Sequence, residues 1–156
     1  MIVKSIVWPN EHATQAFAAA LARQPDLGNV QIQLLGDLGS GKTTFARYLL
    51  AALGVQGRIK SPTYAVVESY ELPDAVNQIT SIWHFDFYRF NDPNEWEEAG
   101  FRDIFASPGL KLVEWPDKAG KHLPQADLQL AIAVSDDDAR HVTLTALTDA
   151  GARLVS

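Results

Sequence analysis

Apolar and polar positions alternate with changing periods along the first third of the chain. An N-cap residue, Asn10, precedes apolar residues at helical spacing, and Gly54 stands where a glycine ends a second amphipathic segment. Between these two segments lies a short apolar run with the character of a buried strand. The pattern predicts a strand over residues 1–8, a helix over 10–23, a strand over 30–35 and a helix over 43–53.

Strand-like segments dominate the rest of the chain. The pattern predicts strands over 64–72, 80–90 and 110–115, a turn near Pro73-Asp74, a short helix over 95–99, and a hairpin over 128–147 with an acidic tip at 136–138. Early alternation followed by strands indicates an α/β, three-layer architecture. We expect a single domain over residues 1–156, with a mixed, mainly parallel sheet and a C-terminal β-hairpin.

The glycine-rich segment between the second strand and the second helix is the sharpest chemical signal. Residues 36–43 read Gly-Asp-Leu-Gly-Ser-Gly-Lys-Thr, a full match to the phosphate-loop pattern G-x-x-x-x-G-K-[ST]. In such a loop the backbone N–H groups face phosphate oxygens, the lysine reaches the β- and γ-phosphates, and the final hydroxyl can bind Mg²⁺. The expected nucleotide-binding residues are Gly36, Asp37, Leu38, Gly39, Ser40, Gly41, Lys42, Thr43 and the following Thr44. The predicted fold is therefore a P-loop NTPase-like domain.

Two acidic residues each end an apolar run and can help to bind the metal. Asp86 ends the run Ile82–Asp86, and Glu114 ends the run Leu110–Glu114. The carboxyl ends of parallel strands meet at one edge of a sheet, so both carboxylates are expected beside the loop. One would orient the metal and the other would bind a water or act as a base, and the sequence does not assign the two roles.

Composition narrows the partners and the compartment. The chain has 156 residues and no cysteine. Its formal charge is −6, so it gains no general electrostatic attraction to a polyphosphate backbone. Any contact with nucleic acid is therefore expected through a protein partner or a local patch. No apolar run approaches the ~20 residues of a membrane span and no signal peptide is evident, so we expect no membrane association and a cytoplasmic location.

Four ordered motifs carry a resemblance that spans nearly the whole chain. They are Gly-Asp-Leu-Gly-Ser-Gly-Lys-Thr-Thr-Phe (36–45), Lys-Ser-Pro-Thr-Tyr (60–64), His-Phe-Asp-Phe-Tyr-Arg (84–89) and Leu-Val-Glu-Trp-Pro (112–116). Together they resemble the TsaE family, the bacterial ATPases of tRNA threonylcarbamoyladenosine biosynthesis. The resemblance implies ATP and Mg²⁺ as cofactors. It also implies the proteins TsaD and TsaB as partners, with TsaD carrying out the transfer to tRNA.

The resemblance also implies roles for individual residues. Lys42 and Thr43 would bind phosphate and Mg²⁺, with Lys42, Asp86 and Glu114 as catalytic residues. Asp86 would be the Walker-B-like acid and Glu114 a metal-site acid. Thr63 would be a switch-like hydroxyl, and Thr14, in the first helix, would lie near the nucleotide.

Two other functions remain open at this stage. A small P-loop kinase also begins with a strand and this loop, but it usually needs an arginine-rich lid and a helical insert. A nucleotide-gated scaffold would keep Lys42 and Thr43 without needing a water-orienting acid. A GTPase would require an N/T-K-x-D motif, which the sequence lacks.

Overall fold

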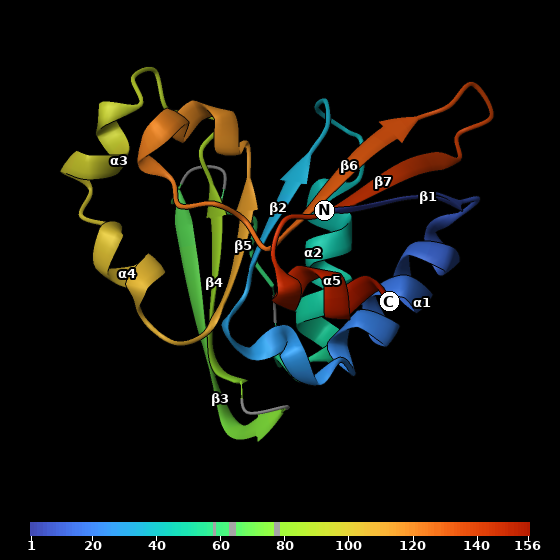
Figure 1. Cartoon of the computed structure of the whole chain (residues 1–156), viewed down its shortest axis with the longest axis horizontal. Coiled ribbons are helices and arrows are strands. Elements are labelled where there is room, and N and C mark those ends of the chain that lie inside the picture. The colour runs from blue at the N-terminus through green and yellow to red at the C-terminus, as the bar shows by residue number, and fades with distance from the viewer. Residues whose placement is uncertain (58, 63–64, 77–78) are drawn as a thin grey trace.

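A computed structural model describes residues 1–57, 59–62, 65–76 and 79–156, with only the backbone described for 73–76 (Figure 1). The described elements are β1 (Ile2–Trp8), α1 (Glu11–Ala22), η1 (Pro25–Asn29), β2 (Gln31–Leu35), α2 (Lys42–Ala52), β3 (Val67–Val76), β4 (Ile79–Asp86), α3 (Asn94–Glu98), α4 (Arg102–Ala106), β5 (Leu110–Glu114), η2 (Pro116–His122), β6 (Leu128–Val134), β7 (Arg140–Ala146) and α5 (Asp149–Val155).

All the described strands form one seven-stranded sheet in the order β1-β7-β6-β2-β5-β4-β3. The inner strands β6, β2, β5 and β4 are parallel to one another, whereas β7 and β3 pair antiparallel with their neighbours. Since β1 pairs antiparallel with β7, it runs in the same direction as the inner strands. The mixed, mainly parallel sheet and the C-terminal hairpin are therefore as predicted. The central place of β2 brings its carboxyl end beside those of β5 and β6.

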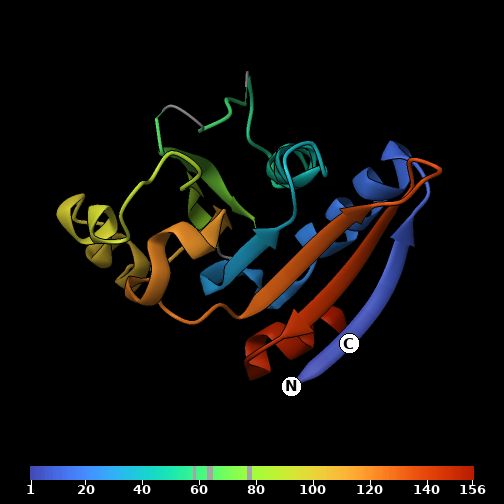
Figure 2. The same ribbon diagram turned by 90° about the horizontal axis from the view of Figure 1, so that it is seen from above.

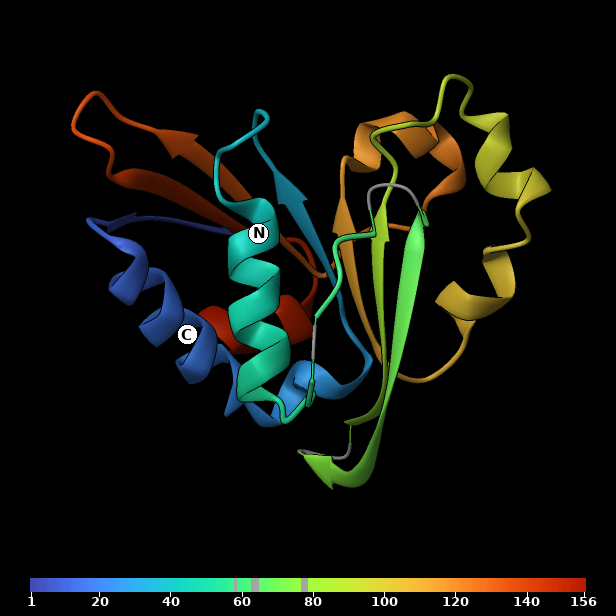
Figure 3. The same ribbon diagram turned by 180° about the vertical axis from the view of Figure 1, so that it is seen from behind.

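Helices cover both faces of the sheet, which gives the three layers that the pattern predicts. One core cluster joins α1, α2 and α5 to apolar residues of β2, β5, β6 and β7. A second, aromatic cluster joins β4 and β5 to α3, α4 and η2 on the opposite face. Viewed from above, α1 and α2 lie on one side of the sheet and α3, α4 and η2 on the other (Figure 2). The reverse view shows α1 and α2 side by side in front of the strands (Figure 3).

Three aromatic rings in mutual contact pack α1 against α2. The ring of Trp8, at the end of β1, lies 5.4 Å from that of Phe17 on α1 and 5.6 Å from that of Phe45 on α2. The side chain of Asn10 caps α1 by accepting a hydrogen bond from the backbone N–H of Ala13 at 3.0 Å, as its N-cap position predicts. Trp8 therefore contacts both helices, and Asn10 fixes where α1 begins.

The described strand bounds correct two predictions. The turn expected at Pro73-Asp74 is wrong, because β3 continues through both residues with a shift in register between Glu71 and Val76. An edge strand such as β3 tolerates proline, which lacks a backbone N–H to donate. The strand expected over 80–90 is too long, since β4 ends at Asp86.

Two short helices, α4 and α5, were not predicted. Each is shorter than the two helical turns that a periodic pattern needs to stand out. Residues 63 and 64, the expected start of the third strand, lie outside the described residues. None of the helices in the described part of the chain combines the length and apolarity that a membrane crossing requires.

Candidate functional site

The loop between β2 and α2 has a backbone that requires glycine. Gly36, Gly39 and Gly41 have φ angles of +146°, +77° and +111°. A Cβ on Gly36 would lie 2.4 Å from the carbonyl oxygen of Ile132 and 2.6 Å from the Oγ of Ser40. Glycine at this position therefore allows the loop to pack directly against β6. The result is a cradle at the N-terminus of an eleven-residue helix, the arrangement that favours phosphate.

Lys42 is buried and turns its ammonium group back along the loop. Its Nζ donates hydrogen bonds to the carbonyl oxygen of Gly36 and, at 2.9 Å, to that of Asp37. The same atom lies 4.3 Å from the centre of the Trp115 ring. Burial lowers the pKa of Lys42, and the nearby carboxylates of Glu114, Asp86 and Asp37 oppose this shift. Lys42 is thus a desolvated cation in an acidic environment.

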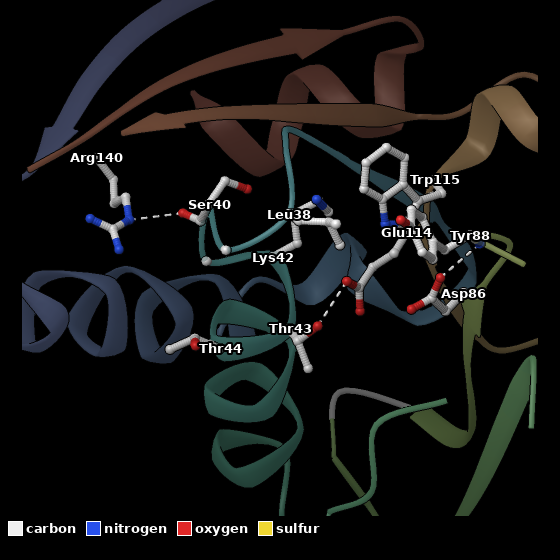
Figure 4. A pocket seen from close by; sticks show the side chains of 12 residues that line it. Leu38, Ser40, Lys42, Thr43, Thr44, Asp86, Tyr88, Glu114, Trp115 and Arg140 are labelled. Carbon is white, nitrogen blue, oxygen red and sulfur yellow. Dashed lines mark hydrogen bonds between the residues drawn. The ribbon is translucent and has the colours of Figure 1, made fainter. Parts of the chain in front are cut away.

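The two predicted carboxylates lie next to each other at the carboxyl ends of β4 and β5. Asp86 and Glu114 are register partners in the parallel pair, and both are buried. The Thr43 hydroxyl donates a 2.9 Å hydrogen bond to Oε1 of Glu114, and Asp86 Oδ1 accepts one from the backbone N–H of Tyr88 at 2.9 Å (Figure 4). Glu114 therefore connects directly to the loop, whereas the described hydrogen bond of Asp86 serves the turn after β4.

A buried histidine completes this side of the site. Nε2 of His84 lies 2.6 Å from Oε2 of Glu114, and the side chain of His84 is fully buried. The two oxygens of Glu114 are thus held by two different side chains, Thr43 and His84. His84 and Asp86 stand two residues apart on β4, so both side chains lie on the same face of the strand.

Most of the loop and both acids line a cavity of about 250 Å³. Its lining brings together loop residues, both acids and three residues from other elements: Leu38, Gly39, Ser40, Gly41, Lys42, Thr43, Thr44, Asp86, Tyr88, Glu114, Trp115 and Arg140. Figure 4 shows the acids on the opposite side of Lys42 from Arg140. The expected residues Gly36 and Asp37 do not line this cavity. They border a smaller pocket behind the loop, and their carbonyl groups hold Lys42.

A second cavity of about 340 Å³ adjoins the first. Gly41, Thr44 and Arg140 line both cavities, so the two meet at the start of α2. Thr14, the residue expected from α1, is buried and lines the second cavity together with Trp8, Asn10, Glu11 and Asp138. The structure therefore brings Thr14 to the site. Thr63, the expected switch hydroxyl, lies outside the described residues.

Arg140 is the site residue that the sequence did not indicate. It lies on β7, and no motif surrounds it. Its approach to the loop depends on the pairing of β7 with β6 and β1, which local patterns do not reveal. Trp115 and Tyr88 also line the cavity, and each follows the end of a strand, where an aromatic residue can equally well belong to the core.

The polar atoms of the site are of the kinds that bind phosphate and Mg²⁺. The buried Oγ of Ser40, inside the loop, has no hydrogen-bond partner among the described residues. No cluster of three or more His, Asp or Glu side chains in the described part of the chain could hold a metal on its own. Mg²⁺ typically takes one or two protein oxygens and completes its shell with phosphate and water, and Thr43 with Glu114 fits that pattern.

Comparison with known proteins identifies the family. The family model described as "Threonylcarbamoyl adenosine biosynthesis protein TsaE" matches residues 8–142. The chain belongs to the TsaE family. The match begins at the end of β1 and ends within β7, so the matched part of this chain includes the phosphate loop, both acids and Arg140.

Individual relatives agree with this assignment. The TsaE protein of Haemophilus influenzae is 41% identical over 140 residues, covering 90% of this chain and 85% of that protein. The TsaE protein of Bacillus subtilis is 35% identical over 147 residues, covering 93% and 88%. Among solved structures, the crystal structure of Bacillus subtilis YdiB superposes with a TM-score of 0.77 at 31% identity, covering 99% of this chain and 94% of that one. The similarity extends over nearly the whole length in each case.

Proposed function

We propose that this protein binds ATP with Mg²⁺ and hydrolyses it to support tRNA threonylcarbamoyladenosine formation by TsaD and TsaB. The observation that carries the proposal is the contact between Thr43 and Glu114, because it joins the last residue of the phosphate loop to the acid of a neighbouring strand. This pairing of a loop hydroxyl with a strand-end carboxylate is what a P-loop NTPase uses around its metal. Membership of the TsaE family supplies the pathway.

Each residue has a distinct task in this proposal. The N–H groups of the loop and of the first turn of α2 bind the β- and γ-phosphates, and Lys42 leaves the carbonyls of Gly36 and Asp37 to contact them. Thr43 and Glu114 hold Mg²⁺, which neutralises charge on the phosphate oxygens when bound. Asp86, beside Glu114 in the register, orients the attacking water. The second cavity, with Thr14, takes the nucleoside.

The partners and the compartment are part of the same proposal. A protein with a net charge of −6 is poorly suited to bind the tRNA backbone, so we assign the tRNA contact to TsaD and TsaB. Hydrolysis by the isolated protein should be slow and should rise in their presence, because association can order the site and exclude bulk water. We place this activity in the cytoplasm, where ATP and tRNA meet.

The test is reconstitution of the reaction with and without this protein. Tubes containing tRNA, threonylcarbamoyl-adenylate, TsaD and TsaB are assayed for modified tRNA and for released phosphate. Lys42→Ala should abolish phosphate release because it removes the cation beside the transferred group, and Lys121→Ala, an exposed lysine outside the cavity, serves as the matched control. Circular dichroism verifies that both variants are folded.

Three results would reject the proposal. Hydrolysis by folded Lys42→Ala at the rate of the wild type would show that the loop takes no part in catalysis. Phosphate transfer to an added small acceptor without net release would favour a kinase. Partner binding that is indifferent to ATP, together with hydrolysis that the partners do not change, would reject the coupled ATPase.

A further inference from the structure

A polar pocket lies on the face of the sheet opposite α1 and α2. On β2 and β6 the residues that alternate with the core residues point to this face, part of which η2 covers (Figure 2). Between η2 and these strands lies a pocket of about 350 Å³, with Gln33, Gln129 and Asp117 in its lining. We call it the amide pocket. It shares no lining residue with the two cavities at the phosphate loop, so it is separate from the proposed nucleotide site.

Three glutamine side chains form a one-way chain of hydrogen bonds that leads to this pocket. Nε2 of Gln31 donates to the carbonyl oxygen of Pro124 at 3.2 Å. Nε2 of Gln33 donates to Oε1 of Gln31 at 2.7 Å, and Nε2 of Gln129 donates to Oε1 of Gln33 at 3.0 Å. A backbone carbonyl can only accept, so Gln31 must turn its NH₂ group to Pro124 and leave its oxygen for Gln33. Gln31 and Gln33 are both buried, so the direction of the whole chain is fixed by the fold.

The chain of amides ends at Oε1 of Gln129, at the pocket. No donor in the described part of the chain bonds to this oxygen. Successive hydrogen bonds polarise one another, which makes a terminal carbonyl a stronger acceptor. Asp117, an exposed residue of η2, adds a carboxylate to the same lining. The amide pocket therefore favours a ligand that donates hydrogen bonds.

The charge around the pocket is negative. Pro116 and Asp117 also line the smaller pocket behind the phosphate loop, where Asp37 supplies a second carboxylate. No lysine, arginine or histidine of the described residues lines either pocket. Leu123 and Leu147 provide apolar walls, which suit the methylene stem of a long cationic side chain. A volume of about 350 Å³ is at the lower end of the ~300–1,000 Å³ of ligand pockets, so it suits a single side chain.

We propose that the amide pocket is a docking site for an arginine side chain of a partner protein. A guanidinium presents five N–H donors in a rigid plane and is weakly hydrated, so it suits two acceptors as different as the Gln129 oxygen and the Asp117 carboxylate. The ammonium group of lysine is compact and more strongly hydrated. Free arginine is a poorer ligand, because its α-carboxylate would meet Asp117 and Asp37 without a cation to balance it. The inference does not depend on the binding of ATP.

The experiment titrates ¹⁵N-labelled protein with N-acetyl-arginine N-methylamide, a capped arginine that stands for the residue within a chain. The side-chain amide resonances of Gln33 and Gln129 report binding. Parallel titrations use capped lysine, capped citrulline, which has nearly the same shape without the charge, and free arginine. We expect capped arginine to bind most tightly and to shift both resonances, with weaker binding of the other three compounds.

Variants assign this binding to the pocket. Asp117→Asn should weaken capped arginine by about two- to fivefold, the usual effect of an exposed ion pair, and Asp117→Lys should abolish its binding. Gln129→Leu should weaken it by roughly tenfold, since it removes a hydrogen bond to a charged group. Asp103→Asn is the matched control, because Asp103 is an exposed acid of α4 that lines neither pocket, and it should bind as wild type.

Four results would overturn the inference. They are no binding of capped arginine to the wild type, equal affinities for capped arginine and capped citrulline, wild-type affinity in Asp117→Lys, and free arginine that binds as tightly as capped arginine. The last result would assign the pocket to a small molecule instead of a protein. If Gln129→Leu does not fold, the Asp117 variants decide, since this side chain is exposed. A protein that bound no ATP would lose its proposed function without changing these titrations, so the two proposals fail separately.

Discussion

His84 and Glu114 form a buried pair on adjacent parallel strands, with Nε2 of the imidazole 2.6 Å from Oε2 of the carboxylate. A carboxylate without its proton can only accept hydrogen bonds, so Nε2 of the tautomer that carries a proton there is the matching donor. The other oxygen of Glu114 accepts from Thr43. The imidazole thus fixes the side chain of Glu114 in the orientation that meets the loop, as partners of metal-binding carboxylates commonly do.

Removal of the imidazole should affect both stability and the proposed metal site. We expect His84→Ala to lower the free energy of unfolding by roughly 1–3 kcal/mol, because it leaves a buried carboxylate oxygen without its donor. Mg²⁺-dependent ATP binding should weaken by about 10- to 100-fold, while metal-free ATP binding changes little. His84→Gln, which keeps a donor, should recover part of the Mg²⁺ dependence. Urea denaturation and ATP titrations with Mg²⁺ or EDTA provide both readouts, and equal losses with and without metal would contradict this role.

The roles of Glu114 and Asp86 can be distinguished by experiment. Glu114→Gln keeps the shape of the side chain but removes the charge next to Thr43, so Mg²⁺-dependent binding and hydrolysis should both fall. Asp86→Asn keeps an oxygen for the N–H of Tyr88, so binding should persist while hydrolysis falls by about 10²-fold or more, the usual size of a general-base contribution. The measurements are ATP affinity with and without Mg²⁺ and single-turnover hydrolysis. If Asp86→Asn loses Mg²⁺-dependent binding and Glu114→Gln does not, Asp86 is the metal-site acid and Glu114 the acid that orients water.

Two glycines of the loop offer a matched pair of alanine substitutions. Gly39→Ala places its Cβ in open space and bears only the strain of a left-handed backbone, about 1–2 kcal/mol. Gly36→Ala bears similar strain and also forces its Cβ against the carbonyl of Ile132, 2.4 Å away. We expect Gly36→Ala to be the more destabilising in thermal unfolding and to lose ATP binding. Equal melting temperatures for the two variants would show that the loop can move away from β6.

Lys111 gives a prediction about pH. It is buried on β5, its Nζ donates to the carbonyl of Ser107, and burial lowers its pKa while Asp127 opposes the shift. Between the lowered pKa and 10.5, the unfolded chain binds more protons at this residue than the folded chain does. The stability of the wild type should therefore rise relative to Lys111→Met as pH increases through that window. Urea denaturation of both proteins between neutral pH and pH ~10 measures the difference, and parallel pH profiles would contradict the assignment.

Local sequence signals predicted most of the elements that carry the site. The Asn10 cap, the strand before the loop, the helix after it and the hairpin strands all appear within one or two residues of their predicted bounds. The expectation that Asp86 and Glu114 lie side by side at one edge of the sheet is confirmed, because each ends an apolar run and parallel strands align their carboxyl ends.

The missed features depend on contacts between distant segments. The course of β3 through Pro73 is set by its place at the edge of the sheet, which no local pattern encodes. The short helix α5 is stabilised by Thr148, whose hydroxyl donates to Asp127 and accepts from the N–H of Gly151. Arg140 contacts the loop only because β7 pairs with β6 in one particular register.

The hydrogen bond between Arg140 and Ser40 joins residues that are 100 positions apart. A ribosome makes the loop early and the hairpin near the end, so the nascent chain carries a loop without its partner for most of synthesis. Until β7 has emerged and paired, nothing fixes the carbonyl of Ser40, and the buried edge of β6 on which Gly36 rests is also missing or unpaired. The contacts that hold the phosphate loop are therefore complete only in a chain that has already made and paired β7.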